Sequence, residues 1–197
     1  MIGVLPETLF VNGVNYPIRT DYRNVLQVFE AFSDLELEEW EKWVVAVCLL
    51  FEDFHSADEV LAAVENGFDI HTAGTQIAWF IFAGKETDRQ EELPTYNWEK
   101  DEQMIFSAVN KVAGMEVREL PYMHWWTFLG YFNEVGEGIF SFVVGIREKL
   151  NKGKKLEPRE REFYNKNKEM IKVERAKTLE EKEEETKLNS LLEEVLG

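Results

Sequence analysis

Cysteine is almost absent from this chain of 197 residues. Because Cys48 is the single cysteine, no internal disulfide can form, and nothing indicates an oxidising compartment. Cys48 lies within the apolar run WVVAVCLLF, a setting typical of an inert core thiol rather than of a nucleophile. The sequence therefore predicts neither a disulfide scaffold nor a thiol active site.

Apolar runs long enough to cross a membrane are also missing. The longest run, residues 43–51, has about half of the residues that a membrane-spanning helix needs. The N-terminal residues MIGVLPETLF lack the basic segment and the long apolar segment of a secretory signal. We therefore expect no membrane span, no signal peptide and a cytosolic protein.

Basic residues are scarce, with 22 Lys and Arg against 38 Asp and Glu and a formal net charge of -16. A protein that binds nucleic acid without sequence preference needs a basic face to displace counterions. Docking on anionic lipid needs basic charge as well. The charge balance therefore argues against nucleic-acid and membrane partners, and it favours a basic or mixed protein partner.

Recognisable catalytic motifs are missing too. The three histidines, His55, His71 and His124, are dispersed, and none has the spacing of a zinc site. The chain has no phosphate loop, no dinucleotide-binding fingerprint and no GxSxG motif. We therefore expect no enzymatic activity, no metal and no cofactor. A metal site built from carboxylates alone stays open as an alternative, because Asp and Glu are plentiful.

Helical spacing of apolar residues is present through most of the chain and predicts a mainly α fold of about seven helices. Before the first helix, Asn12-Gly13 between β-forming residues predicts a small hairpin with a type I′ turn, the only sheet. Thr20 or Asp21 can cap the first helix, Asn97 is a candidate cap for the fifth, and Gly114 ends the fifth. Gly136 and Gly138 give backbone freedom to the turn before the seventh. The expected helices span residues 21–32, 36–51, 56–66, 70–82, 97–113, 123–135 and 139–151.

The composition changes at Asn151 and divides the chain in two. Residues 1–150 form the predicted aromatic-rich helical domain, with the polar residues 85–94 as an internal loop. Residues 151–197 form a charged C-terminal segment, in which residues 157–170 are an expected helix with Phe163 and Tyr164 as docking points. The Glu- and Lys-rich residues beyond Val173 favour a marginal helix that is frayed or that orders on a partner.

The densest aromatic stretch is residues 121–149, which contains His124, Trp125, Trp126 and Phe128. His124, Trp125 and Phe128 fit one wide apolar helical face, and Trp126 lies beside it. This spacing favours a packing cluster in the core. The alternative is an aromatic binding surface, because tryptophan is enriched at interface hot spots. An exposed patch there would indicate self-association or a partner, so a homo-oligomer stays open.

Asp101 lies three residues after Trp98, so the two side chains should share a helical face. The ordinary interpretation is a solvated aspartate. The alternative is a buried acid that pairs with a tryptophan N–H or with Arg147.

Three blocks of sequence carry a family resemblance. An aspartate-bearing helix, a His-Trp-Trp segment with an aromatic helix, and an apolar helix that ends in Ile-Arg follow one another. Together they resemble the bacteriophage Gp15 protein family, found in siphophages and in prophages of Gram-positive bacteria. The resemblance covers most of residues 1–170. The blocks read YNWEKDEQMIFSAVNKVAG, ELPYMHWWTFLGYFNEV and FSFVVGIREKLNKGKKL.

The resemblance implies a role in phage tail morphogenesis, in the cytoplasm of the bacterial host. Genes of this kind lie between those of the tail tube and the tape measure protein, where tail assembly chaperones are encoded. The implied partners are therefore the tape measure protein and tail tube subunits, and no catalytic residues are implied. Two alternatives stay open: a minor structural protein retained in the virion, and an acidic inhibitor or DNA mimic of a host protein.

Overall fold

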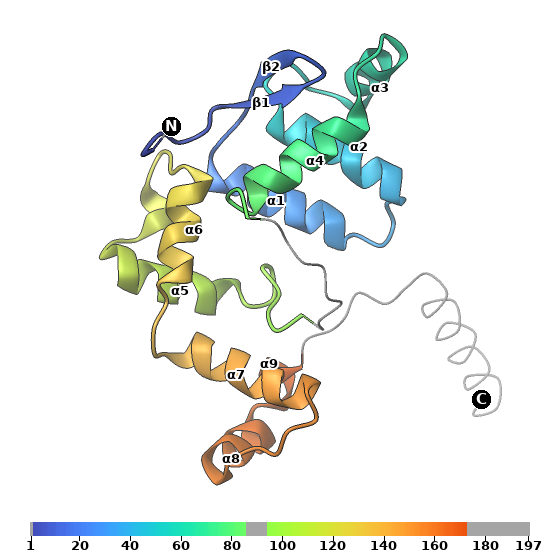
Figure 1. Cartoon of the computed structure of the whole chain (residues 1–197). Coiled ribbons are helices and arrows are strands. Elements are labelled where there is room, and N and C mark those ends of the chain that lie inside the picture. The colour runs from blue at the N-terminus through green and yellow to red at the C-terminus, as the bar shows by residue number, and fades with distance from the viewer. Residues whose placement is uncertain (1, 86–93, 173–197) are drawn as a thin grey trace, which may run out of the picture.

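The computed structural model describes residues 2–85 and 94–172, which form a mainly helical fold with an N-terminal hairpin at one end (Figure 1). The predicted fold class is confirmed. Among the described residues, seven α-helices lie in the predicted helical domain, as expected, and the C-terminal segment adds two where one was expected. The elements are β1 (Thr8–Val11), β2 (Val14–Pro17), α1 (Tyr22–Ser33), α2 (Glu39–Leu50), α3 (Ala57–Glu65), α4 (Ile70–Ile81), α5 (Glu102–Ala113), the 3₁₀ turn η1 (Val117–Glu119), α6 (Trp125–Asn133), α7 (Ile139–Asn151), α8 (Pro158–Lys166) and α9 (Lys168–Ile171).

The hairpin forms as predicted. Strands β1 and β2 pair antiparallel, and Asn12 and Gly13 both have positive φ, at 46° and 87°, as a type I′ turn requires. Leu9 and Val11 point into the core, and β1 lies against α4. The hairpin therefore covers one side of the first helices.

Helices α1 to α4 build the N-terminal half of the core. The Asp21 side chain caps α1 by accepting a hydrogen bond from the Arg23 amide at 2.9 Å, so the cap is Asp21 and not Thr20, the other candidate. Helix α2 begins at residue 39, three residues later than expected, because the Glu41 carboxylate accepts from the Glu38 amide and fixes the cap there. Cys48 is half-buried on α2, and this burial raises the pKa of its thiol, as expected for an unreactive side chain.

Helix α5 begins at residue 102, so the expected start at Asn97 is wrong. The intervening residues form a separate turn, in which the Asn97 side chain accepts from the Lys100 amide at 2.8 Å. The Asp101 carboxylate accepts from the Asn97 amide at 3.0 Å and closes this turn. Gly114 ends α5 as predicted, with a left-handed φ of 71°.

The turn between α6 and α7 does not use the backbone freedom expected of its glycines. Gly138 is extended, with φ at 176°, and Gly136 does not have a positive φ. Ser141 fixes the turn instead. Its hydroxyl accepts from the Gly138 amide at 3.0 Å and donates to the Gly136 carbonyl at 2.9 Å.

Helices α8 and α9 occupy most of the region expected to form one helix over residues 157–170. The helix is interrupted at Asn167, whose φ of -130° is not helical. Phe163 docks edge-on against Phe142 of α7 at a centroid distance of 5.1 Å, and Ile171 is buried against Val143. The expected tail beyond Val173 and nearly all of the expected loop over residues 85–94 lie outside the described residues. The proposed domain boundary at residue 150 stays a prediction.

Candidate functional site

His124 is a buried cap that links the N-terminal segment to α6. Its Nδ1 accepts a hydrogen bond from the Trp126 amide at 3.0 Å. Its Nε2 lies 3.0 Å from the Pro6 carbonyl oxygen, which can only accept. The proton therefore sits on Nε2, and the neutral imidazole donates with one nitrogen while it accepts with the other. Both nitrogens are occupied within the fold, which gives His124 a structural role.

Trp125 and Phe128 lie in the core. The Trp125 indole N–H donates to the Ile81 carbonyl at 2.8 Å, which ties α6 to the end of α4. Phe128 stacks on Tyr22 of α1 at 4.5 Å and 6°. Trp98 packs against Trp125 at 6.0 Å and is only partly buried. These contacts hold the two halves of the chain together.

Trp126 lies at the edge of this cluster, and α4 covers only part of it. Its indole N–H donates to the Phe80 carbonyl at 2.7 Å, and its ring lies 5.4 Å from that of Trp79. Trp79 is 41% exposed, and Phe82, three residues later at the end of α4, is 40% exposed. We refer to Trp79, Phe82 and Trp126 as the aromatic surface.

The sequence alone did not single out Trp79 and Phe82 as surface residues. Trp79 lies in the strongly apolar helix α4, whose composition predicts burial all round, and Phe82 is the C-cap of this helix. The sequence did contain one indication of this exposure. Ile77 and Trp79 project about 200° apart on a helix, so they cannot both face one core.

Asp101 and Arg147 form a buried ion pair, each 2% exposed. The guanidinium binds both carboxylate oxygens, at 2.5 Å and 2.9 Å. The structure thus selects the buried-acid alternative for Asp101, with Arg147 as its partner.

The remaining N–H groups of Arg147 bind main-chain carbonyls. They donate to the carbonyl oxygens of Thr95 at 3.1 Å, Met170 at 2.6 Å and Ile171 at 2.9 Å. All five N–H donors of the guanidinium therefore have acceptors. The side chain joins the segment before α5, α7 and the end of α9, and no donor remains for a ligand.

Asp101, the His124-Trp125-Trp126 segment and Arg147 lie one in each of the three sequence blocks that carry the resemblance, in the same order. A comparison with protein-family models matches the Bacteriophage Gp15 protein family over residues 1–173. The chain belongs to the Gp15 family. The match ends at residue 173, and the described part of the chain ends at Lys172. A search of curated proteins found no match, and a search of solved structures found none.

Glu116 of this Gp15 family protein has a strongly lowered pKa, and its carboxylate also has fixed partners. The Arg118 side chain, assisted by Asn110, donates to Glu116 and lowers the pKa of its carboxyl from 4.5 to about 2. Glu116 also accepts from the Arg118 amide and caps η1. The shift therefore comes first from pairing with the Arg118 side chain, and Glu116 is held by partners within the fold.

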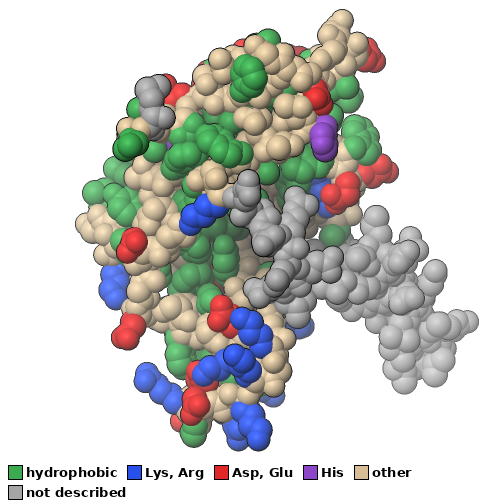
Figure 2. Space-filling model, in the orientation of Figure 1, with side chains coloured by type: hydrophobic (Ala, Val, Ile, Leu, Met, Phe, Trp, Pro, Cys, Tyr) green, Lys and Arg blue, Asp and Glu red, His purple; other side chains and the backbone are tan. Residues whose placement is uncertain are grey.

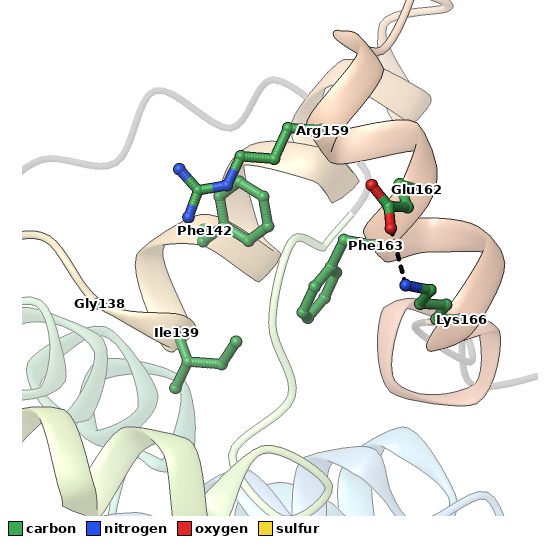
Figure 3. A pocket seen from close by; sticks show the side chains of 7 residues that line it. All are labelled: Gly138, Ile139, Phe142, Arg159, Glu162, Phe163 and Lys166. Carbon is green, nitrogen blue, oxygen red and sulfur yellow. Dashed lines mark hydrogen bonds and ion pairs between the residues drawn. The ribbon is translucent and has the colours of Figure 1, made fainter.

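Among the hollows on the described surface of this Gp15 family chain, two are open and partly apolar. One, of about 390 Å³, lies beside the hairpin and includes Val14, Tyr16 and Phe68. The other, of about 360 Å³, lies between α7 and α8 (Figure 3). Within residues 2–85 and 94–172, no group of three or more His, Cys, Asp or Glu side chains is placed to hold a metal ion. No helix in this part of the chain is long and apolar enough to cross a membrane.

Proposed function

We propose that this Gp15 family protein acts in phage tail morphogenesis as a tail assembly chaperone or accessory protein, in the cytoplasm of the bacterial host. The observation that carries the proposal is the family match over residues 1–173. The role that the family resemblance implies is assembly by protein binding. The protein acts without chemistry of its own and without a cofactor.

The aromatic surface is the proposed contact for the tape measure protein. A long helical protein exposes apolar stripes, and such stripes dock on aromatic-lined surfaces. Trp79, Phe82 and Trp126 offer rigid aromatic area, and tryptophan is the residue most enriched at interface hot spots. Tail tube subunits are the second proposed partner.

The charge of the chain supports a solubilising role. Residues 1–146 contain 25 acidic and eight basic residues. A coat of strongly acidic subunits would keep a bound apolar filament dispersed through mutual repulsion.

Co-expression with the tape measure protein of the same phage or prophage tests the proposal. The wild-type chain should raise the soluble fraction of the tape measure protein, and Trp79→Ser should abolish most of that gain because it removes the most exposed ring of the aromatic surface. Trp40→Ser is the matched control, since Trp40 is also an exposed tryptophan but lies on α2. An equal soluble fraction of the tape measure protein with and without the wild-type chain would contradict the proposal.

The acidic balance also supports a second candidate, an inhibitor that presents its acidic residues to a basic host protein. Affinity purification from infected cells separates the two functions, because the inhibitor would retain a host protein in place of tail proteins. Mass spectrometry of purified virions tests the remaining alternative, a minor tail protein that stays in the particle.

A further inference from the structure

The hollow between α7 and α8 is an open apolar groove with a charged rim. Figure 3 shows Ile139 and Phe142 of α7 and Phe163 of α8 directed into the same space. Ile139 is 45% exposed, although it begins a helix whose other apolar residues are mostly covered. Arg159 lies over the Phe142 ring at 5.6 Å, and Lys166 forms an ion pair with Glu162 on the same rim.

The surroundings of this groove are basic in a protein that is otherwise acidic. Residues 147–172 contain ten Lys and Arg against five Glu, whereas residues 1–146 contain eight basic against 25 acidic residues. Figure 2 shows Lys and Arg side chains gathered over the lower part of the molecule, where Figure 1 places α7 and α8. An acidic apolar segment would therefore complement both the groove and its surroundings.

The C-terminal segment of the same chain has this chemistry. Residues 173–197 contain eight Glu against four basic residues. Five aliphatic residues follow one another there at helical spacing i, i+3, i+4, i+7 and i+8, which is the pattern of one apolar helix face. They are Leu188, Leu191, Leu192, Val195 and Leu196.

The connection is long enough for the segment to reach the groove of its own molecule. Residues 173–187 separate the described chain from the aliphatic pattern, and 15 residues can span up to about 50 Å. The 13 residues of α7 extend over only about 20 Å. Helix α9, from which the connection leaves, lies against both α7 and α8.

We propose that residues 188–196 dock as an amphipathic helix in the groove between α7 and α8 of the same molecule. The aliphatic face covers Ile139, Phe142 and Phe163, and the carboxylates of Glu193 and Glu194 face Arg159 on the charged rim. The inference goes beyond the proposed function and does not depend on it, because both surfaces belong to this chain.

Hydrogen exchange of the full-length protein, followed by mass spectrometry, tests this docking. In the wild type, amides of residues 188–196 should exchange about tenfold more slowly than in the Leu191→Ser, Leu192→Ser double variant, because a docked helix must open before it exchanges. Leu179→Ser removes a leucine outside the pattern and should leave the protection unchanged. Exchange of residues 188–196 at the same rate in the wild type and the double variant would overturn the proposal.

A charge reversal on the groove side tests the partner surface while Ile139, Phe142 and Phe163 are kept. Arg159→Glu should remove most of the protection of residues 188–196, because it places a carboxylate opposite Glu193 and Glu194. Arg161→Glu is the matched control, since it makes the same charge change about 200° around α8, away from the groove. Equal loss in both variants would overturn the assignment of the groove, and protection that grows with protein concentration would overturn docking within one molecule.

Discussion

Arg147 is the residue on which the packing of α5, α7 and α9 depends most directly. It is the shared partner of one carboxylate and three main-chain carbonyls. A charge of this kind is stable inside a protein only while its partners are complete, because water cannot replace them.

Removal of the guanidinium should therefore strongly destabilise the fold. We expect Arg147→Met to lower the free energy of unfolding by ~3–5 kcal/mol, because Asp101 would stay buried without a partner. Urea unfolding measures the change. Arg161→Met, at an exposed position of α8, should stay within about 0.5 kcal/mol of the wild type.

A second substitution distinguishes the ion pair from simple loss of packing. Adding Asp101→Leu to Arg147→Met removes the unpaired charge, so the double variant should lose less stability than the two single changes predict together. Additive losses would mean that the charges contribute independently of each other.

Glu116 provides a titration that can be followed at one residue. Its folded pKa of about 2 lies below the ordinary 4.5, so the carboxylate contributes stability above pH 4.5 and loses this contribution as the pH falls toward 2. Replacing Arg118 by Ala should move the midpoint, observed by NMR, back toward 4.5. Lys111→Ala, on the preceding helix, should leave it unchanged; a midpoint near 4.5 in the wild type would contradict the prediction.

At the scale of elements, the sequence predicted the ends of helices that are closed by neighbouring residues. Asp21 and Gly114 act through their own local backbone, and both were identified from residue type and position. The predicted start of α5 was wrong, because the Asp101 carboxylate closes a separate turn before the helix begins. The same carboxylate pairs with the distant Arg147. Pairing with Arg147 over 46 positions leaves no periodic signal in the sequence.

In the candidate site, too, the sequence predicted what depends on one helix and missed what depends on contacts between helices. Helical spacing correctly grouped Trp125 and Phe128 with the core, because burial of one helix face follows from its own pattern. The exposure of Trp79 and the partial cover of Trp126 depend on how α4 and α6 meet. No pattern within either helix specifies that contact.

Two glycines, one at the end of a helix and one inside a helix, allow a matched test of what the backbone requires at each position. Gly114→Ala should destabilise the protein by ~1–2 kcal/mol, because an alanine at a φ of 71° is strained. Gly145→Ala should stabilise it by ~0.5–1 kcal/mol, since Gly145 lies inside α7 and its added methyl group meets no atom within 4 Å. Thermal unfolding of both variants measures the difference, and a shift of the same sign in both would contradict the prediction.

At the scale of the whole molecule, the two halves of the described chain are residues 2–85 and residues 94–172. They are joined by main-chain contacts as well as by the core. The amide of Trp125 donates to the Thr20 carbonyl at 2.7 Å, and that of Tyr22 donates to the Met123 carbonyl at 3.0 Å. Core residues from both halves belong to one large cluster, and Val143, Ile146 and Ile171 form a second, smaller one. We therefore expect the halves to unfold together.

The Trp125→Phe variant tests this coupling. The change leaves the buried Ile81 carbonyl without its donor, which should cost ~1–3 kcal/mol. Circular dichroism in the near and far ultraviolet should show one coincident transition at a lower temperature. Trp126→Phe, at a half-buried position, should lower the transition less, and two separate transitions in either variant would show that the halves unfold independently.

The contacts of Arg147 with Thr95, Met170 and Ile171 are made to main-chain oxygens, which every amino acid supplies equally. Selection at these contacts therefore acts on chain length rather than on side-chain chemistry. Related chains can change the residue types at 95 and 170 freely. An insertion or deletion between 147 and 171 would shift the carbonyls out of register with the guanidinium, so the number of residues in that interval should vary far less than their identity.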